Sequence, residues 1–115
     1  MKVSLNGFGE QVATFEAEST VTVGSVVKVT SNGTVGICAE KEPFCGVVLS
    51  VRNGFAAVQL GGYAGNVPYT GTGMAVGYKT IAAAADGKVQ VDAAGRNLLV
   101  TDVDATASTC GFLLD

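Results

Sequence analysis

Apolar and polar residues along this chain form short blocks separated by turn dipeptides, a pattern that is typical of β-rich proteins. Residues 26–30 and 34–39 are two such apolar blocks, and they flank Asn32-Gly33. Because Asn-Gly favours the left-handed backbone conformation of tight turns, we expect a β-hairpin here. The same reasoning along the chain predicts strands at residues 12–15, 26–30, 34–39, 44–51, 55–60, 81–85, 89–92, 97–103 and 112–114.

One of these segments is ambiguous when it is taken alone. Residues 81–85, Ile-Ala-Ala-Ala-Ala, have high helix propensity. The segment is nevertheless too short to hold a helix without help from packing, and it ends at Asp86-Gly87, a second hairpin dipeptide. We therefore expect a strand at this position.

Part of the pattern occurs twice. Val23-Gly24 begins a unit that ends with the apolar block after Cys45-Gly46, and Val76-Gly77 begins a longer unit that ends after Cys110-Gly111. The extra length predicts an insertion within residues 93–108. The sequence thus predicts an all-β protein, namely a small single-domain barrel or β-clip-like fold of about 8–10 short strands with two imperfect internal repeats, at residues 23–50 and 76–115.

Two segments outside these units are candidates for contact with other proteins. Residues 1–19 form a polar lead-in, either an N-terminal arm or an edge strand, before the β domain of residues 20–115. Its isolated aromatic residue, Phe8, packs either on the domain itself or on a partner. Residues 61–73 link the two units and are rich in glycine and tyrosine, and we expect them to form a strand and a loop. The candidate contact residues are Phe8, Tyr63, Pro68 and Tyr69.

Composition narrows the classes of function. The chain has 115 residues, of which 48% are hydrophobic and 15% charged, and its formal net charge is −3. Its seven basic residues are scattered, whereas nucleic-acid-binding proteins gather cations on one face, so we expect no nucleic-acid partner. No apolar segment reaches the roughly 20 residues that cross a bilayer, and the N-terminus lacks the apolar core of a signal peptide. We therefore expect no membrane partner and a protein that works in the compartment where it is made.

The sequence offers little for catalysis or for metal and cofactor binding. It has no histidine, and its three cysteines, which lie in or beside apolar blocks, are spaced too widely for a structural zinc site. In a reducing compartment such cysteines behave as small buried apolar residues. Asp92, Asp102 and Asp104 suggest a weak calcium cluster, although solvated turn residues are the favoured interpretation. The glycine-rich residues 61–73 lack the lysine ending of a phosphate-binding loop. We expect no catalytic residue, metal or cofactor, and no enzymatic activity.

Several segments together resemble a known family. They are the lead-in, Val-Gly-Ser-Val-Val-Lys-Val at residues 23–29, Phe-Cys-Gly-Val-Val at 44–48, Val-Pro-Tyr-Thr-Gly at 67–71, Asp-Gly-Lys-Val-Gln-Val at 86–91 and Val-Thr-Asp-Val-Asp at 100–104. With these segments, which span nearly the whole chain, the protein resembles small phage and prophage proteins found with head genes. Those proteins are similar to capsid decoration (head-stabilising) or head-fibre proteins.

The resemblance implies a structural virion or prophage protein that binds and stabilises an assembled capsid shell. The implied partner is the major capsid protein, and the implied location is the virion surface after synthesis in the bacterial host cytoplasm. Decoration proteins of this kind tend to form symmetric trimers, so the resemblance also implies a homo-oligomer. They tend to contact the shell through an N-terminal segment, which here would be residues 1–8.

Two other functions stay open at this point. The first is a carbohydrate-binding or small-ligand-binding β module that uses Tyr63, Tyr69 and Tyr78 as stacking surfaces, although the absence of tryptophan counts against it. The second is a β-barrel domain that accompanies a catalytic partner encoded on another chain.

Overall fold

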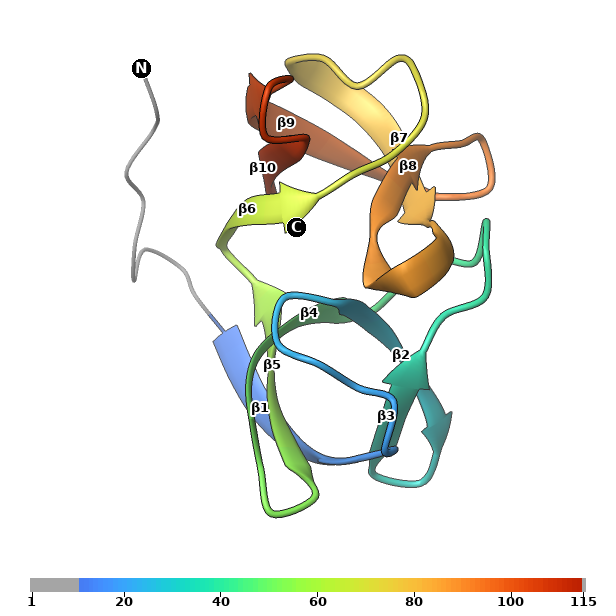
Figure 1. The fold of residues 1–115 in the computed structure, drawn as a ribbon, viewed down its shortest axis with the longest axis vertical. Helices are drawn as coiled ribbons and strands as arrows, with labels where there is room; N and C mark the ends of the chain where they lie inside the picture. The colour runs from blue at the N-terminus through green and yellow to red at the C-terminus, as the bar shows by residue number, and fades with distance from the viewer. Residues whose placement is uncertain (1–10, 115) are drawn as a thin grey trace.

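The computed structural model describes residues 11–114, which form ten β-strands and one short 3-10 helix (Figure 1). The elements, in chain order, are β1 (Gln11–Ala17), β2 (Val26–Ser31), β3 (Thr34–Ile37), β4 (Gly46–Arg52), β5 (Phe55–Gly61), β6 (Tyr63–Pro68), β7 (Gly77–Ala83), η1 (Ala85–Gly87), β8 (Val89–Val91), β9 (Arg96–Asp104) and β10 (Thr109–Leu113). The expected all-β fold is thus confirmed. Within the described residues, no helix is long and apolar enough to cross a membrane.

The first half of the chain is a closed barrel with the strand order β1-β3-β2-β4-β5. β1 closes it by pairing antiparallel with β5 and parallel with β3, where Glu16 lies opposite Thr34. Residues 11–17 are therefore an integral barrel strand with two neighbours, neither an arm nor an edge strand. The candidate Phe8 and the rest of residues 1–10 lie outside the described residues.

The second half repeats this topology. Its five-stranded sheet has the order β6-β10-β9-β7-β8, and a single parallel bridge between Tyr69 and Val89 joins its two ends. This bridge corresponds to the β1–β3 pairing, so each strand from β1 to β5 has a counterpart from β6 to β10. In Figure 1 the first half, blue to green, lies below the second half, yellow to red.

The expected duplication therefore exists, but its boundaries differ from those inferred from the sequence. The structural halves are residues 11–61 and 63–114, so the strand at residues 63–68 begins the second half instead of linking two units. Cys45-Gly46 leads into β4, whereas Cys110-Gly111 lies inside β10, the counterpart of β5. The two Cys-Gly motifs therefore lie in strands that do not correspond to each other in the repeat. The inferred insertion at residues 93–108 is the region of the β9–β10 hairpin.

The expected turns form where the dipeptides lie. Asn53 and Gly54, between β4 and β5, have φ angles of 52° and 80°, and Asp86 and Gly87, between β7 and β8, have φ angles of 61° and 75°. Both pairs are left-handed at both residues, as a two-residue hairpin turn with the correct twist requires. Between β2 and β3 only Gly33 is left-handed.

Two groups of buried side chains form the core. One fills the first barrel and includes Val27, Val35 and Val58. The other fills the second half and extends to residues of the first half, among them Phe44, whose ring centroid lies 6.0 Å from that of Phe112. Because this second group spans both halves, the protein is one domain with a shared core.

Candidate protein-contact surface

Tyr63, the first of the candidate contact residues, lies on the outer face of β6. Its ring lies close to Gly65 and Gly111, where no side chain intervenes, and its hydroxyl donates a hydrogen bond of 2.8 Å to Oδ1 of Asp102. Burial, followed by the hydrogen bond to Asp102, raises the pKa of Tyr63 to about 12. Tyr63 is therefore a neutral, fixed side chain whose ring extends across the surface of the sheet.

Tyr69 and Pro68 lie elsewhere. Tyr69 is partly buried against the core of the second half, and its backbone N–H donates to the carbonyl of Ser108. Pro68 pairs with Thr109 at the end of β6 and is also partly buried. The structure thus does not gather Tyr63, Pro68 and Tyr69 on one exposed surface.

A different set of residues accompanies Tyr63. Tyr63 lies directly opposite Leu113 in β10, Leu113 opposite Leu99 in β9, and Leu99 opposite Tyr78 in β7. Residues directly opposite one another share a face of the sheet. These four residues, which we call the tyrosine–leucine row, therefore cross four strands on the outer face of the second half.

The row is apolar and graded in exposure. Tyr63, Leu99 and Leu113 are half-buried, whereas Tyr78 is 70% exposed. Tyrosine is enriched at protein–protein contacts, and the two leucines between the tyrosines add apolar area that a partner can bury.

Two leucine pairs in the sequence mark this surface. Leu98-Leu99 and Leu113-Leu114 are adjacent apolar pairs, while a strand with one solvated face alternates apolar and polar residues. Leu98 and Leu114 are buried, so the neighbouring leucines face outward.

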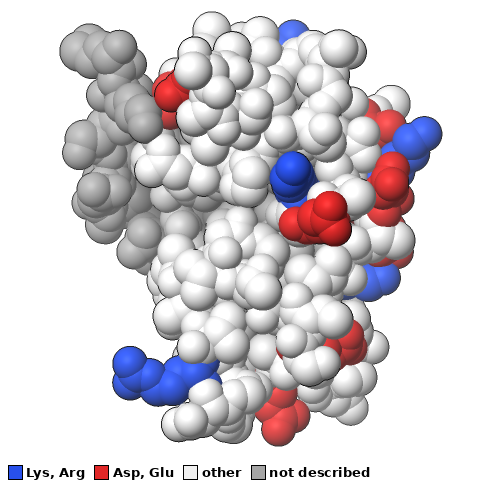
Figure 2. All heavy atoms as spheres, in the orientation of Figure 1, with Lys and Arg blue, Asp and Glu red and all other residues white. Residues whose placement is uncertain are grey.

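Charged side chains are sparse over much of the molecule. Figure 2 shows scattered acidic and basic side chains between large uncharged areas on one face.

The closest ion pair of the described residues joins Lys28 and Glu42 at 2.8 Å, and the backbone N–H of Ala39 donates to the same carboxylate. This pair fixes the connection between β3 and β4. It raises the pKa of Lys28 and lowers that of Glu42, because each charged form is hydrogen-bonded by the other.

The cysteines and the aspartates serve local structure. Cys38 and Cys110 are buried and Cys45 is half-buried, and burial raises the pKa of all three thiols. Asp92 accepts a hydrogen bond from the N–H of Ala94, and Asp104 accepts from those of Thr106 and Ala107. Such bonds stabilise turns. Among residues 11–114, no three potential metal ligands come together.

No family model matches the chain, and no curated protein or solved structure shows significant similarity to it.

Proposed function

We propose that this protein is a structural component of a phage or prophage particle that binds an assembled capsid shell and stabilises it. The supporting observation is the tyrosine–leucine row, a continuous apolar strip on a rigid sheet. The segments that resemble capsid decoration and head-fibre proteins are the reason for naming a shell as the partner.

The physical requirements of such a role are modest. Each copy needs one apolar surface that a partner covers, because burial of apolar side chains supplies most of the affinity in such contacts. Many copies on one shell then add their contributions, so a weak single contact is sufficient. The folded backbone of the sheet presents these side chains without a cost for ordering a loop, and the hydrogen bond to Asp102 already holds Tyr63 in place.

The test is co-sedimentation of the purified protein with mature shells of the cognate capsid protein at micromolar concentration. Tyr78→Asp places a charge on the exposed end of the row, and we expect binding at least roughly tenfold weaker than that of the wild type. Val23→Asp is the matched control, because Val23 is 65% exposed in the first half and lies outside the row. A chain without residues 1–9 tests the N-terminal contact that the family resemblance implies.

Two outcomes would contradict the proposal. A wild-type protein that stays in the supernatant has no affinity for the shell. Equal binding of Tyr78→Asp and Val23→Asp would show that the row is not the contact.

A carbohydrate-binding module is the second candidate, since Tyr78 presents an exposed ring. Tyr63 lies on the same face but is separated from Tyr78 by β9 and β10, roughly 14 Å at the usual strand spacing. Tyr69 packs against the core. A glycan screen in which Tyr78→Ala abolishes the hits would favour this function over shell binding.

A further inference from the structure

A second exposed surface lies in the first half of the chain, on the outer face of β4, β5 and β1. Arg52 of β4 is directly opposite Phe55 of β5, and Phe55 is directly opposite Glu16 of β1. All three side chains are exposed. The row therefore carries a cation at one end, an aromatic ring at its centre and an anion at the other end.

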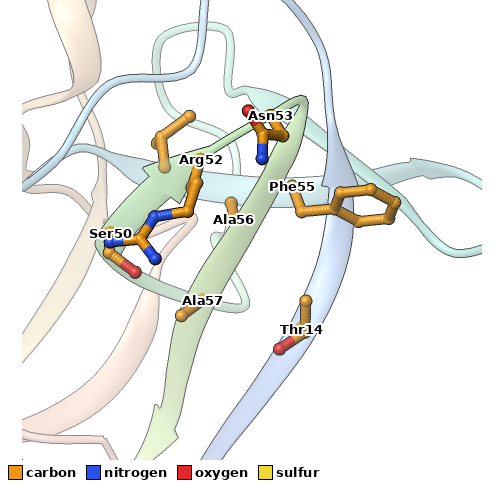
Figure 3. A pocket seen from close by; sticks show the side chains of 8 residues that line it. Thr14, Ser50, Arg52, Asn53, Phe55, Ala56 and Ala57 are labelled. Carbon is orange, nitrogen blue, oxygen red and sulfur yellow. The ribbon is translucent and has the colours of Figure 1, made fainter.

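A hollow lies beside this row. The neighbouring set of opposed residues, Ser50, Ala57 and Thr14, has small side chains, and together with Arg52 and Phe55 it lines a surface pocket of about 580 Å³. Figure 3 shows the Arg52 side chain extending toward Ser50 and the Phe55 ring extending the other way, toward β1. These small side chains leave one side of the Phe55 ring uncovered.

The two charges of the row do not neutralise each other within the chain. Two strand spacings, roughly 10 Å, separate Arg52 from Glu16. Among the described residues, the Arg52 guanidinium makes no hydrogen bond or ion pair, and the Glu16 carboxylate accepts only a long bond, 3.5 Å, from the Thr34 hydroxyl. Within residues 11–114, both charges are therefore available to a partner.

Apolar side chains adjoin the charges. Phe55 is 48% exposed and Val12, on the same face of β1, is 47% exposed. An exposed arginine next to an exposed aromatic ring is the composition that dominates binding energy at protein interfaces.

We propose that this face binds a second copy of the chain about a two-fold axis. A two-fold contact places the same patch on both copies, so a patch must be complementary to itself. The Arg52–Phe55–Glu16 row meets this requirement. Rotation by 180° about an axis through the centre of the row sets Arg52 of each copy against the partner copy's Glu16 and brings the two Phe55 rings together at the axis.

The contact is small and hence weak. Stable interfaces bury at least roughly 1,000 Å² in total, which a patch on three short strands barely reaches. We expect a dimer that dissociates in the micromolar range and weakens as salt screens the two ion pairs. This inference goes beyond shell binding and does not depend on it, because its test uses the purified protein alone.

The test is sedimentation equilibrium over a range of concentrations. Arg52→Glu and Glu16→Arg each turn both ion pairs of the dimer into repulsions, so each variant alone should raise the dissociation constant about tenfold or more. An equimolar mixture of the two variants restores both pairs in a heterodimer, and we expect its dissociation constant to return to the wild-type value. Lys88→Glu and Glu40→Arg make the same charge changes at exposed sites away from the face, and should leave association unchanged.

Phe55→Ser tests the contact between the two rings independently and should raise the dissociation constant by a similar factor. A wild-type protein that stays monomeric at all concentrations overturns the proposal, and so does a trimer that the variants leave unchanged. Single variants that weaken association while their mixture fails to restore it would also overturn the two-fold pairing. Monomeric variants that still co-sediment with shells would separate this result from the outcome for shell binding.

Discussion

The thiols illustrate how single residues respond to the core around them. Cys38 is 6% exposed and Cys110 is 1% exposed, and burial raises their pKa to about 11 and about 12. Burial raises the pKa of a thiol because the charged thiolate loses its hydration. At neutral pH both residues are therefore uncharged members of the core, as the apolar blocks around them predict.

These pKa values predict sensitivity to alkaline pH. An unfolded thiol ionises near pH 8.5, while the folded thiols keep their protons, so the stabilising difference is complete below pH 8.5 and is lost as pH rises toward the folded values. For Cys110 the free energy of unfolding should fall by about 2 kcal/mol between pH 8.5 and pH 10. Urea unfolding of wild type and Cys110→Ala at both pH values checks this, and an equal fall in the two proteins would contradict it.

Glycines act at the scale of the element where two strands approach closely. Gly46 begins β4, and a Cβ atom at this position would overlap the backbone carbonyl of Gln59 in β5. Gly95, just before β9, has the same relation to the backbone of Ile81 in β7. Because neither contact can move without shifting a strand, both positions require glycine.

We expect Gly46→Ala to lower the free energy of unfolding by about 3 kcal/mol or more, since overpacking against backbone cannot relax through a side chain. Gly54→Ala is the control. Gly54 has open space around it and a φ of 80°, so its substitution should cost only about 1 kcal/mol of backbone strain. Denaturant unfolding curves compare the two, and a smaller loss in Gly46→Ala than in Gly54→Ala would show that the strands can separate.

The elements also show what could be predicted from the sequence. Strands joined by Asn53-Gly54 and Asp86-Gly87 were predictable, because hairpins form from local turn chemistry. β6 could be predicted only as part of a strand and loop within residues 61–73, since it contains Gly65, Pro68 and the left-handed Asn66, all poor strand formers that pairing with β10 overrides.

The candidate site was less predictable than the strands. Of the predicted contact residues that the structure describes, only Tyr63 lies in the tyrosine–leucine row. Leu99 and Leu113 belong to this row because of the register of three strand pairs, which no local sequence pattern specifies. In the same way, Arg52 and Glu16 belong to one face only because β1 pairs with β5 across the barrel.

At the scale of the molecule, contacts around Phe44 help to join the two halves. Its ring packs near Phe112, and the guanidinium of Arg96 lies 5.8 Å from its centroid. Arg96 also donates to the backbone carbonyls of Phe44 and Leu114, at 3.3 Å and 2.8 Å. The connection between β3 and β4 in the first half is thereby tied to the C-terminal strand of the second.

Because the two halves share these contacts, we expect them to unfold together, although each half has the same topology. Exposing the second core would remove the cover from Phe44, Val26 and Val47 of the first half, so neither half keeps its buried surface alone. We expect a single calorimetric transition with equal calorimetric and van't Hoff enthalpies. Phe44→Ala should lower the free energy of unfolding by about 3–5 kcal/mol and keep one transition. Two transitions in the wild type would mean that the duplicated halves are energetically independent, and the rigid support proposed for both contact surfaces would then belong to each half separately.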